Sequence, residues 1–263
     1  MDTGPSVIDR VGTLLRTLAS REPGGASTTA LARTTGLPRP TVHRLLTALS
    51  GEGLVEREES TGSWHLGPEC FLLGAAATAR HDITPFARES VRRIARRTGE
   101  SAFFSVRRGD ETVCLLREDG SFPIRSHVLY EGVRFPLGVA SAGLAILAHL
   151  SERERETYLT ERTLNHDYGA EHAPGPLRER IAETRRSGFA LNPGLIVEGS
   201  WGMAAAVFNG SDDPRWALSI TGIEARFPPA RREELGRLLL SEAHELAGAV
   251  AGIAGGSDGR TVR

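Results

Sequence analysis

The sequence predicts an α+β protein with an N-terminal winged helix-turn-helix domain, a connecting helix and a second domain of mixed strands and helices. Three observations predict it. Two short helical segments flank a tight turn at Gly36, a two-stranded pattern follows them directly, and the apolar period changes from helical to alternating at Ser101. We expect the winged domain over 6–67, the connecting helix over 68–82, the second domain over 83–255 and a disordered tail over 256–263, with a disordered head over 1–5.

The helix-turn-helix pattern follows a first helix expected over 6–20. Gly36 can adopt the positive φ that a sharp turn between two helices needs. Pro38 and Pro40 fit the first turn of the second helix, where a missing N–H costs little. Apolar residues of that helix then recur at i, i+3, i+4 and i+7: Val42, Leu45, Leu46 and Leu49. This stripe packs the helix on its partner and leaves the other face polar.

That polar face carries residue types that read DNA. Arginine binds guanine O6 and N7 bidentately, and threonine contacts a thymine methyl group or a phosphate. An ordinary two-helix corner with a solvated polar face is the alternative. The candidate DNA-binding residues, including one from the hairpin that follows, are Thr28, Arg39, Pro40, Thr41, His43, Arg44 and Arg57.

Two alternating runs, 54–57 and 63–66, flank a turn at Ser60-Thr61-Gly62 and predict a β-hairpin. A hairpin directly after a helix-turn-helix is a wing, and we expect Arg57 near the DNA backbone. The three glutamates Glu56, Glu58 and Glu59 must point away from phosphate, or the wing contributes little.

These residues make the chain similar to the IclR family of bacterial transcriptional regulators. The N-terminal match runs through 14–18, 31–38, 41–46 and 64–67, and the second half matches through 97–101, 135–137, 142–145 and 187–190. The resemblance covers about residues 6–255. It implies a GAF-like effector-binding domain with a mixed or antiparallel sheet, a double-stranded DNA operator, and a homodimer or dimer of dimers that the connecting helix helps to form.

Composition is consistent with this interpretation. The 263 residues carry a net charge of −1, so DNA affinity must come from a local arrangement of charge. All 32 basic side chains are arginine. Neither Cys70 nor Cys114 has metal-ligand spacing, so we expect no metal and no cofactor. The polar N-terminus and the short apolar run over 139–150 predict a cytoplasmic protein without membrane contact.

Catalytic motifs are missing from the sequence. It has no Gly-x-Ser-x-Gly elbow, no P-loop and no His-Glu-x-x-His, so we expect a protein that is not an enzyme. His166, Asp167 and His172 fall in a loop and are interpreted as surface features. The remaining alternative is a winged helix that docks protein or a ligand-sensing module without specific DNA binding.

The second domain is expected to begin with a helix over 83–97. Period-two runs predict strands over 102–106, 112–116, 122–129, 203–208 and 216–221. Further helices are expected over 140–149, 177–187 and 228–253.

The resemblance implies a small-molecule pocket in this domain, and a carboxylate suits it because hydroxyls lie near the N-terminus of a buried helix. Ser219 and Thr221 can equally be ordinary strand hydroxyls. The candidate effector-binding residues are Ser141, Ala142, Asn192, Leu195, Trp201, Gly202, Ser219 and Thr221.

The loop before Gly202 departs from the family pattern. Leu195, Ile196 and Trp201 stand where the family has acidic residues, and Gly202 stands where it has a cysteine. Gly138 and Leu144 replace a common histidine and lysine. Because these changes make the site larger and more apolar, we hypothesise an aromatic or medium-length organic acid as effector.

Overall fold

The computed structural model describes residues 6–81, 83–125, 127–209 and 213–256. The chain divides into two compact units, residues 1–82 and 83–263. The expected disordered head, 1–5, lies outside the described residues, as does the expected tail except for Gly256, which ends the last helix.

The first unit has the helix-turn-helix and hairpin that the sequence predicts. Its elements in chain order are α1 (Val7–Ala19), α2 (Thr28–Thr35), α3 (Arg39–Gly51), β1 (Val55–Arg57), β2 (Trp64–Leu66) and α4 (Pro68–His81). Ser6 and Asp9 form a capping box that starts α1. Leu14 and Leu18 of α1 pack with Val42 and Leu46 of α3 in one buried cluster. The predicted apolar stripe of α3 therefore faces its own core.

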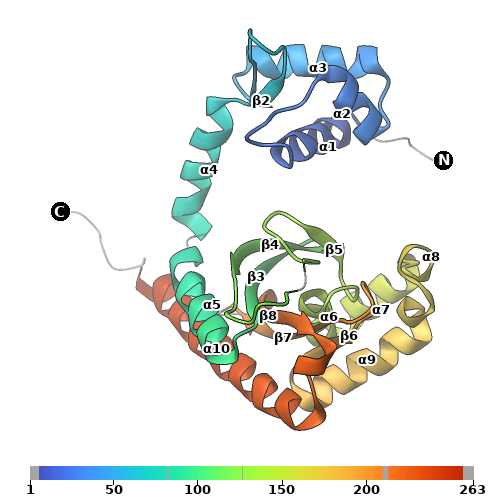
Figure 1. Ribbon diagram of the computed structural model, residues 1–263, viewed down its shortest axis with the longest axis vertical. Helices are drawn as coiled ribbons and strands as arrows, with labels where there is room; N and C mark the ends of the chain where they lie inside the picture. Colours follow the sequence, from blue (N-terminus) through green and yellow to red (C-terminus); the bar gives the residue numbers. More distant parts are fainter. Residues whose placement is uncertain (1–5, 82, 126, 210–212, 257–263) are drawn as a thin grey trace. The chain divides into compact units, whose positions relative to one another are not determined.

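The second unit is built on a six-stranded sheet in the order β5-β4-β3-β8-β7-β6, in which all neighbouring strands are antiparallel (Figure 1). The strands are β3 (Ser101–Arg108), β4 (Glu111–Glu118), β5 (Arg134–Pro136), β6 (Ala190–Pro193), β7 (Ser200–Phe208) and β8 (Pro214–Ile223). The helices are α5 (Thr84–Thr98), α6 (Ser141–His149), α7 (Glu152–Glu161), α8 (Asn165–Tyr168), α9 (Pro174–Ser187) and α10 (Pro229–Gly256).

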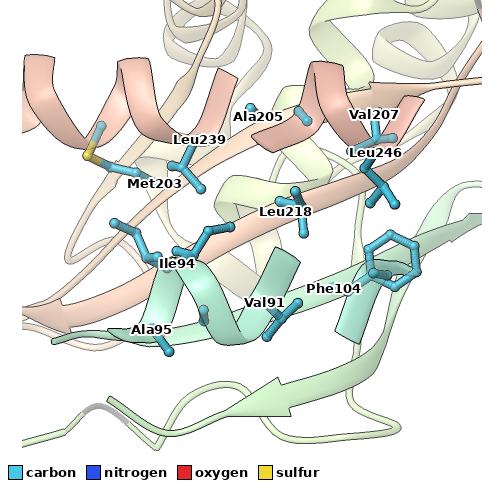
Figure 2. Packing of buried hydrophobic residues seen from close by; sticks show 14 of the residues in the cluster. Val91, Ile94, Ala95, Phe104, Met203, Ala205, Val207, Leu218, Leu239 and Leu246 are labelled. Atoms are coloured by element: carbon cyan, nitrogen blue, oxygen red, sulfur yellow. The ribbon is translucent and has the colours of Figure 1, made fainter. Parts of the chain in front are cut away.

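The two faces of this sheet bury different helices. Side chains alternate along a strand, so Phe104, Leu218 and Met203 share one face across β3, β8 and β7. That face packs on Ile94 of α5 and Leu239 of α10, as Figure 2 shows. The opposite face carries small residues of β7 and β8, which lie in a second cluster with α6 and α9.

The prediction of a strand over 122–129 is wrong. The third strand of the predicted series is β5, which starts at Arg134. The N–H of Phe122 donates to the carbonyl of Gly99, which holds the start of this segment at the end of α5. Pairing with β4 begins only at Gly132, whose N–H donates to the Cys114 carbonyl, and the Val133 carbonyl accepts from the Cys114 N–H. Leu129, at the end of this segment, packs on Phe103 of β3. The described part of 122–129 is called the strap below.

Two short helices, α7 and α8, and the edge strand β6 were not anticipated. Ser151 caps α7 by accepting from the N–H of Glu154. Helix α7 has a weak apolar pattern because most of its side chains are charged. Among the described helices, none is both long and apolar enough to cross a membrane.

Candidate DNA-binding surface and small-molecule pocket

The N-terminal half of α3 exposes most of the residues predicted to contact DNA. Arg39, Pro40, His43 and Arg44 are exposed, and Thr41 is half-buried. No side chain caps the N-terminus of the helix, where Pro38 occupies the N-cap position. Backbone N–H groups at a helix N-terminus attract anions. This end of α3 therefore suits a phosphate as well as base edges.

The helix-turn-helix also has a local positive charge that the whole chain lacks. No aspartate or glutamate occurs from Pro23 to Gly51, whereas Arg33, Arg39 and Arg44 do. All three arginines are exposed. Phosphate contacts supply most of the sequence-independent affinity for DNA, so this surface can bind DNA despite the net charge of −1.

Thr28 and Arg57 have internal contacts that shape the wing. The hydroxyl of Thr28 accepts a hydrogen bond from Trp64 Nε1 at 3.0 Å, which joins α2 to β2. Arg57 donates from Nε to the Gly62 carbonyl at 3.2 Å, and its guanidinium lies 5.8 Å from the Trp64 ring centroid. Both residues therefore position the hairpin, and Arg57 remains exposed.

The wing glutamates are arranged by the strand register. Glu56 pairs with His65 and Arg57 pairs with Trp64, so the first glutamate and the arginine lie on opposite faces of the hairpin. The hydroxyl of Thr61 donates to Glu58 at 2.5 Å. The face of the wing that carries Arg57 is thus separate from the Glu56 carboxylate.

The second unit contains a small cavity on the α6 side of its sheet. Its volume is about 20 Å³. Five of the predicted effector-binding residues line it from four different elements: Ser141 of α6, Asn192 of β6, Trp201 and Gly202 of β7, and Thr221 of β8. Because a water molecule needs roughly 10–15 Å³, the cavity has room for about one.

Buried hydroxyl groups without partners lie on the face of the sheet that carries this cavity, and one of them, that of Thr221, lines it. Among the described residues, Oγ of Ser101, Oγ of Ser219 and Oγ1 of Thr221 are buried and have no hydrogen-bond partner. Ser101 pairs directly with Thr221 across β3 and β8, so their side chains share a face. Unsatisfied buried hydroxyls cost about 1–3 kcal/mol each, which favours a site that a polar ligand completes.

Gly202 brings α6 close to the sheet. A Cβ atom at this position would lie 3.1 Å from Oγ of Ser141. Ala140 at the N-cap of α6 provides no side-chain cap, and Ser141 and Ala142 are buried in its first turn. A buried, uncapped helix N-terminus beside hydroxyl groups is suited to a carboxylate.

Asn192 is oriented by its own hydrogen bonds. Its Nδ2 donates to the Val139 carbonyl at 2.7 Å, and its Oδ1 accepts from the Leu195 N–H at 3.0 Å. The amide thereby ties the loop after β6 to the turn before α6. Asn192 shapes the cavity wall through these bonds.

The other three predicted residues do not line the cavity. Ala142 packs in the α6 core, Leu195 supplies its backbone N–H to Asn192, and Ser219 is fully buried. Trp201 borders the cavity, but its ring stacks on Phe227 with centroids 6.4 Å apart. Since Gly202 faces α6, the adjacent Trp201 side chain is directed to the opposite face of the sheet, against α10.

The sequence prediction missed four lining residues: Val128 and Leu129 of the strap, Ala140 and Ser200. Ile196, which the sequence analysis named among the changes in the loop, also lines the cavity. Leu129 contacts Phe103 and Cys114 beneath it. Burial raises the pKa of the Cys114 thiol to about 12, so this side of the cavity stays neutral. The buried hydroxyl of Ser101 was also missed. It can be found from the alternation of side chains along the strands, because Ser101 lies in register with Thr221.

Comparison with known proteins agrees with both units. The model of the IclR helix-turn-helix domain matches residues 7–59, and that of the bacterial transcriptional regulator IclR C-terminal domain matches residues 75–247. The transcriptional repressor IclR of Escherichia coli is 28% identical over 235 residues, covering 88% of this chain and 85% of the relative. The regulator BhcR of Paracoccus denitrificans is 28% identical over 245 residues, covering 93% and 87%.

Solved structures show the same fold. An IclR regulator from Alicyclobacillus acidocaldarius has a TM-score of 0.77 at 22% identity, covering 93% of this chain and 98% of that chain. An IclR homologue from Microbacterium hydrocarbonoxydans, crystallised with 4-hydroxybenzoate, has a TM-score of 0.75 at 22% identity, covering 93% and 99%. The curated relatives are named transcriptional regulators and repressors. This chain belongs to the IclR family of bacterial transcriptional regulators.

Proposed function

We propose that this regulator binds a near-palindromic operator through α3 and that a small organic acid in the second unit modulates this binding. The observation that carries the DNA part is the exposed, uncapped N-terminus of α3 within a stretch that lacks acidic residues. Arg39, His43 and Arg44 supply base contacts in the major groove, with Thr41 beside them. Arg57 and Thr28 hold the wing against the DNA backbone.

The acid site lies at the α6 N-terminus. The partnerless hydroxyl of Thr221, the nearby Ser141 and the first-turn backbone of α6 together suit a carboxylate. The complex of an IclR homologue with 4-hydroxybenzoate supports an aromatic acid as one member of this class. Because the cavity measures only about 20 Å³, it can hold the carboxylate alone, and the rest of the effector must extend beyond it.

We infer that the functional form is a homodimer, or a dimer of dimers, acting in the cytoplasm where bacterial DNA lies. Helix α4 exposes three consecutive apolar side chains, Phe71, Leu72 and Leu73, which are 76%, 56% and 55% exposed. A contiguous apolar patch of this kind is typical of an interface. Two copies joined there would place two α3 helices on two half-sites.

Replacing Arg44 with alanine should weaken operator binding by about 1–3 kcal/mol, because a bidentate guanine contact is worth that much. Fluorescence anisotropy with labelled operator measures the loss, and size-exclusion chromatography should show an unchanged assembly. Arg186→Ala, which removes an exposed arginine of α9, is the matched control. Full operator affinity in Arg44→Ala would remove this residue from the contact surface.

Replacing Thr221 with valine should not lower the free energy of unfolding and should raise it by up to about 1–3 kcal/mol, because the lost hydroxyl is buried without a partner in the acid-free protein. The same change should weaken organic-acid binding by about 12- to 160-fold, the worth of one hydrogen bond to a charged group. Urea unfolding and calorimetric titration with 4-hydroxybenzoate measure the two quantities.

Thr98→Val is the control for that variant. The Thr98 hydroxyl donates to the Ile94 carbonyl and accepts from the Glu100 N–H, so its loss should cost about 1–3 kcal/mol of stability. If Thr221→Val is destabilised as much as Thr98→Val, the Thr221 hydroxyl is structural, and the acid site as proposed is contradicted.

Footprinting on the DNA upstream of the gene, across a salt series, tests the DNA part. We expect a protected site with two half-sites one helical turn, or a multiple of it, apart. If six to ten phosphates are contacted, affinity should fall about 10³–10⁵-fold between roughly 50 and 200 mM salt. Genome-wide selection of bound fragments extends the search beyond the neighbouring DNA. No sequence-specific protection at low salt in either assay would favour a winged domain that docks protein.

A further inference from the structure

A second and much larger cavity borders the acid site. Its volume is about 930 Å³, and it shares Val128 and Ser200 with the wall of the small cavity. The small cavity has room for about one water molecule, so an acid of several carbons must extend beyond it. The larger cavity is the space on this face into which such a molecule continues.

The larger cavity has two carboxylates at its rim. Glu198 lies in the loop between β6 and β7, and Glu224 directly follows β8. The N–H of Glu224 donates to the Gly199 carbonyl at 2.9 Å, which holds the two loops together. Both side chains are exposed, and within the described part of the chain neither forms an ion pair.

One arginine contributes positive charge to this cavity. Arg125 also lines it, but its Nη1 lies 2.8 Å from Oδ2 of Asp119, and its Nε donates to the Phe122 carbonyl. His127 adds an imidazole, which is a hydrogen-bonding group. Asp119 is shared with Arg117, whose Nε lies 2.7 Å from its other oxygen. The lining therefore carries two glutamates against one arginine, which is an excess of negative charge.

Part of the wall of the larger cavity is apolar. Val128, Val197 and Ile223 line the larger cavity beside its charged groups. A methylene chain or an aromatic ring buries apolar surface there, whereas a second carboxylate would face Glu198 and Glu224.

We propose that the effector of this chain is an elongated zwitterion, an organic acid with a cationic amine at its far end. Its carboxylate occupies the site at Ser141 and Thr221, its apolar body lies along Val128 and Ile223, and its ammonium group pairs with Glu198 and Glu224. The inference rests on the proposed acid site for its anionic end only. The amine end depends on a different cavity and on different residues.

The test compares straight-chain acids of four to eight carbons in three forms: the monocarboxylic acid, the ω-amino acid and the dicarboxylic acid. Binding to the full-length protein is measured by isothermal titration calorimetry. At the best length, the ω-amino acid should bind about tenfold more tightly than the monocarboxylic acid, the effect of two partly exposed ion pairs. The dicarboxylic acid should bind most weakly.

The Glu198→Gln/Glu224→Gln double variant should lose the preference for the amine while its affinity for the monocarboxylic acid stays unchanged. Glu179→Gln, which alters an exposed glutamate of α9, should keep the preference. Equal binding of the amino acid and the monocarboxylic acid, or tightest binding of the dicarboxylic acid, overturns the zwitterion proposal alone. Binding of no acid in any form overturns the acid site as well.

Discussion

The second unit depends on the strict alternation of side chains along β3, β8 and β7. On one face this alternation presents Phe104, Leu218 and Met203 to α5 and α10, and their burial holds the sheet in a single register. On the other face the same register places Thr221 beside Gly202 and opposite Ser101. A slip of one residue would exchange the two faces. The apolar core on one side therefore positions the partnerless hydroxyls on the other.

In the first unit, too, the packing of apolar side chains decides where the functional groups lie. The chain as a whole is almost neutral, yet the helix-turn-helix concentrates arginine where no acid occurs, from Pro23 to Gly51. Packing of Val42 and Leu46 fixes which face of α3 is buried, so Arg39 and Arg44 are left exposed together. A local field of this kind attracts phosphate without making the whole protein bind anions indiscriminately.

The sequence predicts the helix-turn-helix and the hairpin because their signals are local: a glycine turn, a 3.6-residue stripe and a short alternating pair. It mislocated β5 because strand pairing there is set by distant contacts, from Phe122 to Gly99 and from Val133 to Cys114. The direction of the Trp201 ring follows from strand parity once Gly202 is placed against α6, and that placement needed the structure. The sequence could not predict that Glu198 and Glu224 line the same cavity, because a backbone hydrogen bond between Glu224 and Gly199 joins their loops.

In the proposed regulator the acid site and the DNA-binding surface are coupled. Coupling is reciprocal, so the affinity for the acid must differ between the free protein and its operator complex by the factor by which the acid changes operator affinity. Calorimetric titration of the best-binding acid into the protein alone and into the protein saturated with operator measures this difference. We predict a change of about 5- to 150-fold, the usual range of allosteric coupling. Equal acid affinities in the two titrations would contradict the account.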